Sequence, residues 1–300
     1  MTAKANSSMS LTKVLGAVLV ATVVLFLANL LTSGDKASTS GWVLYVVGAL
    51  ITMGIYFYFA DKPIWQVGTR EVVYMAIGAA LYGVLSWATN VIQLPSVSLV
   101  SLRPAVVIPV FFGFAFGPVV GFFTGAVGNI LGDAITGWGV YPVWDLGNGL
   151  MGMVPGLIWA FRDEKARGKA TYTVLYIVGG ILLLFTLLSL LFPNVEHPWA
   201  GQTSGQWWPL LLVLLALVVG AFFLLRSRGV VAASVVWGAL GVIIGMAFAS
   251  IADIWVNGYS IATAILGEFV PAAGGNLFMV VILLPILYAA WEAARSQSGR

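Results

Sequence analysis

Long apolar stretches separated by short polar segments follow one another along almost the whole chain. A helix needs about 20 residues to cross a bilayer core of about 30 Å. The pattern predicts ten membrane-spanning helices, over residues 11–31, 42–59, 71–92, 102–116, 119–135, 143–160, 173–192, an eighth ending at 225, 230–255 and 273–291. The first stretch could also be a signal peptide, but it is long for one and lacks a clear small-residue cleavage site, so we expect a retained span.

Three segments, each charged or containing a helix-breaking proline, separate some of these apolar stretches. Gly117-Pro118 is expected to separate two helices, because proline disfavours the helical conformation at the residue before it. Residues 162–169, RDEKARGK, are expected to form the most charged loop, and another loop is expected to run through Pro271. The predicted fold is therefore an all-α membrane protein of about ten transmembrane helices.

Composition agrees with this class. The chain has 300 residues, of which 60% are hydrophobic and 8% charged, and its mean hydropathy is +1.00, whereas soluble domains carry about 25% charged residues. It has no cysteine and one histidine, His197. Disulfides, cysteine metal sites and a histidine-based metal site or triad are therefore excluded, and no cofactor is expected.

The basic residues divide unequally between the two sides that ten spans define. Twelve of the fourteen lysines and arginines fall on the side that carries both termini, and only Lys36 and Arg103 fall on the other. Positively charged loops stay in the cytoplasm. We therefore expect a prokaryotic plasma-membrane protein with both termini cytoplasmic and with Arg103 at the outer side.

Glycine recurs every four residues between residues 102 and 157. This spacing places small residues on one face of a helix and lets backbones approach closely in lipid. A fainter echo lies further along, because one glycine-aspartate spacing occurs twice: Gly121, Gly125 and Asp133, then Gly241, Gly245 and Asp253. Both helices would run outward, so the echo is parallel and does not predict an inverted-repeat transporter.

Polar and aromatic residues gather at the expected outer ends of these helices. Ionisable groups at membrane depth are costly and are functional candidates, and aromatic rings beside amides and carboxylates suit a small heterocycle. The candidate substrate-binding residues are Arg103, Asn129, Asp133, Tyr141, Trp144, Asp145, Asn148, Asp253 and Asn276.

Each candidate also has a structural interpretation, which stays open from the sequence. Asp145 could cap the helix that starts just before it, and Asp133 could belong to a hydrogen-bonded helix junction. Arg103 could be an interfacial arginine whose charged end reaches water, or it could pair with Asp133, Asp145 or an acidic ligand. The aromatic residues could form an interfacial belt.

Missing motifs exclude several functions. The chain has no phosphate-binding G-x-x-x-x-G-K-[ST] sequence, no H-E-x-x-H and no G-x-S-x-G, which argues against an ATPase, a zinc protease and common hydrolases. No span carries a chain of carboxylates across its middle, which argues against a proton-coupled pump. No catalytic residue is predicted.

Three sequence blocks together resemble the substrate-binding S components of energy-coupling factor (ECF) vitamin transporters. They are TREVVYMAIGAALYGVLS from Thr69, LRPAVVIPVFFGFAFGPVVGFFTGAVGNILGD from Leu102, and the W-x-x-G-x-G-x-x-G-x-x-P-G pattern from Trp144 to Gly156. The stretch from Val230 and the run beginning at Ala272 are similar to the last two helices of that family. The resemblance covers half to two-thirds of the chain.

The resemblance implies a six-helix core that binds a vitamin or vitamin precursor with high affinity. It also implies partners: a coupling transmembrane protein and two ATPase subunits that supply the energy. An A-x-x-x-A motif on the first core helix docks onto the coupling protein in that family, and Ala76 and Ala80 match it. Packing of these small residues inside the bundle is the alternative.

The chain departs from the family pattern in two places. The expected domains are a two-helix membrane extension at 1–68 and an S-component-like domain at 69–300 that carries an inserted helical hairpin at about 173–226. The main alternative function is a stand-alone secondary transporter or facilitator for a small solute, and a lipid-modifying membrane enzyme is a third. No residue identifies the substrate.

Overall fold

The computed structural model describes residues 39–90, 101–197, 202–225 and 229–297. The first predicted span, 11–31, lies outside the described residues. The described elements, in chain order, are α2 Thr39–Tyr58, η2 Pro63–Trp65, α3 Thr69–Thr89, η3 Pro104–Val106, α4 Val107–Phe116, α5 Pro118–Thr136, α6 Pro142–Gly156, η4 Leu157–Ala160, α7 Glu164–Leu191, β1 Glu196–His197, β2 Gln202–Thr203, η5 Ser204–Gln206, α8 Trp208–Leu224, α9 Gly229–Val256, the π-helical η6 Thr263–Phe269 and α10 Val270–Gln297.

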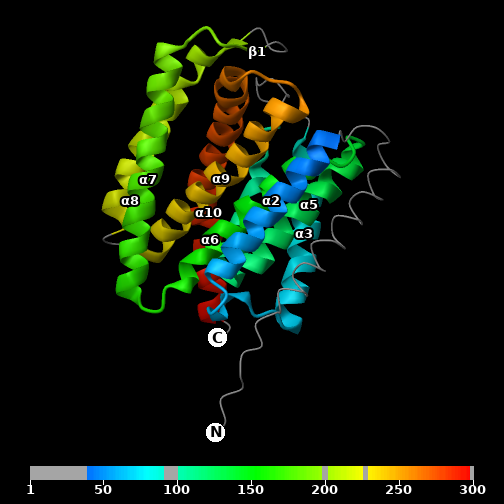
Figure 1. The fold of residues 1–300 in the computed structure, drawn as a ribbon. Helices are drawn as coiled ribbons and strands as arrows, with labels where there is room; N and C mark the ends of the chain where they lie inside the picture. Colours follow the sequence, from blue (N-terminus) through cyan, green and yellow to red (C-terminus); the bar gives the residue numbers. More distant parts are fainter. Residues whose placement is uncertain (1–38, 91–100, 198–201, 226–228, 298–300) are drawn as a thin grey trace.

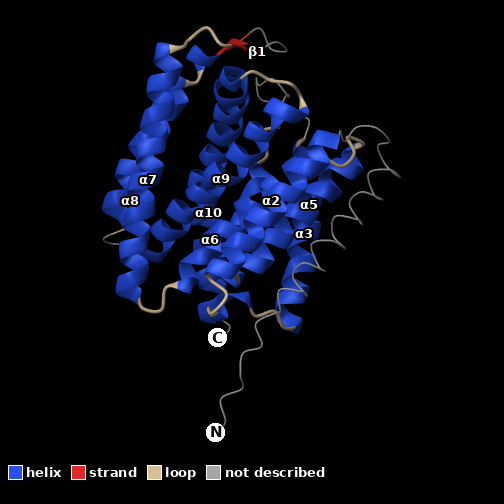
Figure 2. Cartoon of the chain, viewed as in Figure 1, coloured by secondary structure: helices blue, strands red, loops and turns tan. Residues whose placement is uncertain are grey.

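The helices form one bundle, and helix accounts for nearly all of the described chain (Figure 2). The two-residue strands β1 and β2 pair antiparallel, with Glu196 opposite Thr203, at the upper end of the bundle in Figure 1. The connections from α2 to α3 and from α6 to α7 lie at the lower end, where α10 also finishes (Figure 1). The predicted all-α class is confirmed.

The predicted count of about ten membrane spans is not confirmed. The described residues contain nine α-helices. Six helical segments among them are long and apolar enough to cross a membrane: Gly41–Tyr58, Thr69–Thr89, Pro118–Thr136, Glu164–Leu191, Gly229–Val256 and Thr263–Gln297. The predicted helix at 102–116 is shorter than expected, because η3 occupies its start and α4 has only ten residues.

Helix α6 lies between α5 and α9 with its backbone against both. A methyl group added at Gly121 or Gly125 of α5 would overlap the carbonyl oxygens of Gly152 or Asn148 in α6. On the other flank, a methyl group at Gly241 of α9 would lie 2.5 Å from the carbonyl oxygen of Met151. The repeated glycine spacing thus corresponds to two helices that pack in the same way on the two sides of α6.

The predicted break between α4 and α5 is confirmed. Gly117 has φ 106°, a left-handed backbone conformation that favours glycine, and Pro118 is the first residue of α5. The backbone N–H of Gly117 closes α4 by donating to the carbonyl oxygen of Gly113. The chain therefore reverses direction in a single residue, which lets α4 and α5 lie close together.

Two boundary predictions were wrong. Helix α7 begins at Glu164, inside the stretch predicted as a loop, because the Asp163 side chain caps it by accepting a hydrogen bond of 2.7 Å from the Ala166 backbone N–H. No loop runs through Pro271, because the π-helical η6 continues directly into α10 and Pro271 lies inside this continuous helical segment.

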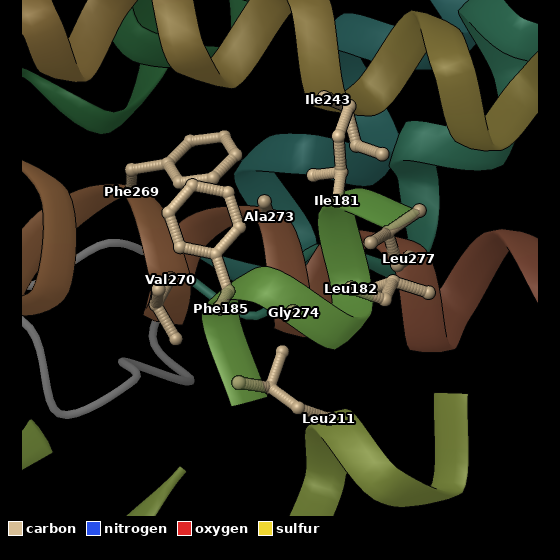
Figure 3. A pocket seen from close by; sticks show the side chains of 10 residues that line it. All are labelled: Ile181, Leu182, Phe185, Leu211, Ile243, Phe269, Val270, Ala273, Gly274 and Leu277. Carbon is tan, nitrogen blue, oxygen red and sulfur yellow. The ribbon is translucent and has the colours of Figure 1, made fainter. Parts of the chain in front are cut away.

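Helices α7 and α8 form a hairpin beside α9 and α10 (Figure 1). An apolar pocket at this junction is lined by Ile181, Leu182, Phe185, Leu211, Ile243, Phe269, Val270, Ala273, Gly274 and Leu277 (Figure 3). A water-sized sphere can reach only about 10 Å³ of it, roughly the room that one water needs. This pocket is a packing junction and cannot hold a vitamin-sized molecule.

Candidate functional site

A buried ion pair stands at the upper end of the bundle. Arg103, the residue before η3, places Nη2 2.8 Å from Oδ1 of Asp133, in the last turns of α5. Its Nη1 donates to Oδ1 of Asn129, one turn earlier on α5. Arg103 therefore pairs with Asp133, one of the partners expected from the sequence, and it is not an arginine that reaches out to water.

Asn129 joins the two aspartates on neighbouring helices. Its Nδ2 donates to Oδ2 of Asp133 at 2.9 Å and to Oδ1 of Asp145 at 2.8 Å. Asp145 lies in the first turn of α6, where the helix dipole favours an anion. Asp145 is 1% exposed, and its Oδ2 has no hydrogen-bond partner among the described residues. A buried oxygen without a partner is costly, and such atoms are uncommon in native proteins.

A second chain of hydrogen bonds connects α3, α6 and α9. The Tyr82 hydroxyl donates to Oδ1 of Asn148 at 2.6 Å, and Asn148 Nδ2 donates to the carbonyl oxygen of Trp144. The indole N–H of Trp144 in turn donates to Oδ2 of Asp253 at 3.3 Å. The two aspartates of the repeated spacing, Asp133 and Asp253, thus flank the start of α6 from opposite sides.

The segment Gly137–Tyr141 connects α5 to α6 above the aspartates. Arg103 lies over the ring of Trp138, 5.7 Å from its centroid, a distance at which a cation is attracted to an aromatic face. Tyr141 is 38% exposed, and its pKa is raised by burial and further by the charge of Asp133. Tyr141 thus lies near the ion pair, although no direct polar contact joins them.

Further acidic residues extend the polar region along α9 and η6. The pKa of Tyr259 is raised to about 12, mainly by burial and also by the charges of Glu268 and Asp253. Asn276 lies apart from the ion pair, because its Nδ2 faces the sulfur of Met246 at 3.2 Å. Among the described residues, Asn276 shares no hydrogen bond with the group of Arg103, Asn129, Asp133 and Asp145, nor with the chain from Tyr82 to Asp253.

The structure adds Tyr82 to this network, and sequence reasoning missed it. Tyr82 is fully buried on the face of α3 that packs against α5. A signal was available, since Gly78, Tyr82 and Ser86 recur every four residues on one face of the helix. The predicted docking motif, Ala76 and Ala80, lies on a different side of α3.

The predicted docking residues Ala76 and Ala80 are both exposed on α3. Their neighbours Gly78 and Ala79 are buried instead. Within the described residues, Ala76 and Ala80 therefore do not pack inside the bundle, which was the alternative prediction for this motif.

Comparisons with known proteins connect this arrangement to a family. Residues 66–195 match the family described as ECF-type riboflavin transporter, S component. The resemblance to ECF-type S components is thus confirmed for this region. The matched region runs from before α3 to beyond α7 and includes Tyr82, Arg103, Asn129, Asp133 and Asp145. The family consists of membrane transport subunits and is not an enzyme family.

Similar curated proteins come from Vibrio and Aliivibrio species. The chain is 42% identical over 120 residues to a UPF0397 protein of Vibrio atlanticus, which covers 38% of this chain and 65% of the relative. It is 38% identical over 92 residues to UPF0397 proteins of Aliivibrio fischeri and Aliivibrio salmonicida, covering 31% of this chain and 49% of each relative. The chain thus spans about half to two-thirds of the length of these relatives. No solved structure matches.

Proposed function

We propose that this protein is the substrate-binding subunit of an ECF-type importer that takes up a vitamin or vitamin precursor. The observation that carries the proposal is that residues 66–195, the region matching S components, contribute most of the buried polar network. A buried polar group destabilises the protein unless it has a full set of hydrogen-bond partners. A buried polar group that lacks partners is therefore a candidate for a functional role. The unpartnered Asp145 oxygen favours a functional reason here.

The binding site in this proposal lies between the upper ends of α5, α6 and α9. Its polar groups are Arg103, Asn129, Asp133 and Asp145, with Trp144 and Asp253 on the α9 side. Trp138, Trp144 and Tyr141 supply aromatic surface for a ring, and the amide and carboxylate groups supply hydrogen bonds for its edge. Such sites bind without bond making or breaking, so the transport energy must come from elsewhere.

Partner ATPases supply that energy in this proposal, through a coupling membrane protein that contacts α3. Ala76 and Ala80 offer a face of small residues, which permits the close helix contact that association in lipid needs. The exposed side chains around them are Val72, Val73 and Ile77. The basic segments at 62–70 and 162–169 belong to the lower end, so we assign that end, with both termini, to the cytoplasm of a prokaryotic cell.

Two measurements test the proposal. The purified full-length chain is denatured, and mass spectrometry identifies any small molecule released from it, with the protein-free membrane extract as the control. Uptake of that compound is then measured in cells that express the chain with or without the ECF coupling protein and its ATPases. We expect uptake only with the ATPases and its loss when ATP is depleted. Uptake by the chain alone, insensitive to ATP, would establish the secondary transporter instead.

A further inference from the structure

The buried groups at the upper end of the bundle carry an excess of acidic side chains. Asp133, Asp145 and Asp253 are each buried. Among the described ion pairs, Arg103 supplies the one cation bonded to this group, and it pairs with Asp133. Asn129 and Trp144 contribute neutral N–H donors to the other two aspartates. Two carboxyl groups are therefore hydrogen-bonded without a positive charge.

The unpartnered atoms show where a missing partner belongs. Asp145 Oδ2 is buried and accepts no hydrogen bond from the described residues, although the other carboxylate oxygen, Oδ1, accepts one from Asn129. The hydroxyl of Ser250, one turn before Asp253 on α9, is also buried without a partner. Arg103 Nε is a buried donor that finds no acceptor in the part of the chain that the structure describes. The site thus lacks a donor for Asp145 and an acceptor for Arg103.

A positively charged nitrogen meets these requirements better than a neutral donor. In a medium of low dielectric an ion pair with hydrogen bonds offsets the cost of burying a carboxylate, which a neutral group does only in part. An anionic ligand would meet Asp145 and Asp253 with like charge. The partly buried rings of Trp138 and Trp144 would attract a cation and disfavour an anion.

We propose that the substrate of this site is a small cationic heterocycle that places a charged nitrogen against Asp145 and an oxygen or ring acceptor against Arg103. This inference rests on the proposed function, and it names the substrate class of that same site. This inference excludes anionic vitamins as substrates of the site. Neutral ones bind weakly, because they cannot form an ion pair with Asp145.

The segment Gly137–Tyr141 connects α5 to α6 at this site. Gly137 and Gly139 have φ of 80° and 93°, conformations that are open to glycine and strained for other residues. The segment is held at both ends, since Trp138 N–H donates to the Asp133 carbonyl and Asp145 N–H donates to the Tyr141 carbonyl.

The test compares matched compounds on the full-length wild-type protein by thermal shift and titration calorimetry. The pairs are pyridoxamine with pyridoxine, and the aminomethyl form of deazaguanine with its cyano form. Thiamine is a further cation, riboflavin a neutral ring, and biotin and pantothenate are anions. We expect one cation of this panel to bind, and to bind about tenfold or more tightly than its neutral counterpart.

Variants assign the effect to Asp145. Asp145→Asn is expected to weaken the cation about ten- to a hundredfold and to leave the neutral compounds nearly unchanged. Asp61→Asn, at an exposed carboxylate of the lower end, is the control and should change neither. The pairwise comparison on the wild type needs no variant, so it stands even if Asp145→Asn fails to fold.

Several outcomes would overturn the inference. They are preferential binding of riboflavin, biotin or pantothenate, no binding by any cation of the panel, or an Asp145→Asn variant that binds the cation as tightly as the wild type. Riboflavin that binds and is taken up with the ATPases would overturn this inference and leave the proposed function intact. ATP-independent uptake of a cation would contradict the proposed function and leave this inference intact.

Discussion

Asp133 and Asp145 look alike in the sequence, yet their surroundings predict different roles. Both oxygens of Asp133 are bonded, one of them to Arg103, whereas one oxygen of Asp145 has no partner. Asp133→Asn leaves Arg103 buried without its ion pair, and we expect a loss of about 3 kcal/mol of stability. Asp145→Asn removes a charge that is only half satisfied, so we expect unchanged or higher stability.

The midpoint of thermal unfolding in detergent, followed by tryptophan fluorescence without added ligand, separates these two roles. Asp61→Asn, at an exposed carboxylate of the lower end, serves as a control for the loss of a carboxylate elsewhere. The contrast fails if Asp145→Asn melts as far below the wild type as Asp133→Asn does, since both aspartates would then be structural.

Single residues were predictable where the chain itself brings them together. Asn129 and Asp133 are one helical turn apart, and the short segment before Asp145 keeps it near them. The choice of Asp133 as the partner of Arg103 was not predictable, because 30 residues separate the two and Asp145 was an equal candidate. The spacing of Gly78, Tyr82 and Ser86 could have placed Tyr82 on a packed face, but not its bond to Asn148, because 66 residues separate the two.

Individual helices differ in how much added volume they tolerate. Gly125 of α5 faces the α6 backbone so closely that a methyl group would overlap the carbonyl oxygen of Asn148, whereas Gly220 of α8 has no atom within 4 Å of such a group. We expect Gly125→Ala to destabilise by about 1–3 kcal/mol because both backbones must shift. Gly220→Ala should be neutral or stabilising by up to about 1 kcal/mol, because alanine favours helix.

Unfolding midpoints of the two glycine variants provide the measurement, and Gly220→Ala is the matched control for the same chemical change. Equal effects would mean that the contact between α5 and α6 is looser than the structure shows. The loss should extend to ligand binding, because Asn148 belongs to the polar network.

The exposed alanines of α3 give a prediction about coupling. Tryptophan at Ala76 and Ala80 would hold a partner helix several ångströms away. We expect unchanged ligand affinity, measured on the purified chain, and loss of ATP-driven uptake in cells that express the partners. Val219→Trp on α8, whose side chain is also exposed, controls for the added ring. Full uptake by the Ala76→Trp, Ala80→Trp variant would place the partner contact on another surface.

The hydrophobic pattern predicted the positions of the helices better than it predicted their first and last residues. The apolar run of α7 begins near residue 173, yet the helix starts at Glu164 because the Asp163 cap outweighs the charges of RDEKARGK. The π-helical turn before Val270 likewise has no signature in the composition of its residues. Runs of apolar residues report burial and lipid contact, whereas caps and turns decide where a helix ends.

For the whole molecule, the unequal charge distribution predicts a measurable orientation. The chain has no cysteine, so single cysteines report sidedness without background. Cysteine at Asn194, in the connection between α7 and α8, should react with an impermeant maleimide in intact cells. Cysteine at Lys165 should react only after the membrane is opened. Labelling of position 165 from outside would reverse the assignment of the lower end to the cytoplasm.

The domain boundaries and the role of the α7–α8 hairpin remain predictions. The hairpin packs on α9, η6 and α10, and the ring of Phe185 in α7 lies 4.9 Å from the ring of Phe269 in η6. The sequence pattern could show that two further apolar helices exist. It could not show which helices they join, because lipid-facing and protein-facing leucines are chemically the same in a membrane.

The packing of α6 between two glycine faces has a mechanical consequence. Sliding α6 by a single residue, about 1.5 Å along its axis, would drive its carbonyl groups out of the gaps that Gly121, Gly125 and Gly241 provide. The three helices therefore lack a low-energy path for relative translation and behave as one rigid block. A cargo exchanged at their upper end must come and go either through deformation of the connecting segments or through reorientation of the entire block in the lipid.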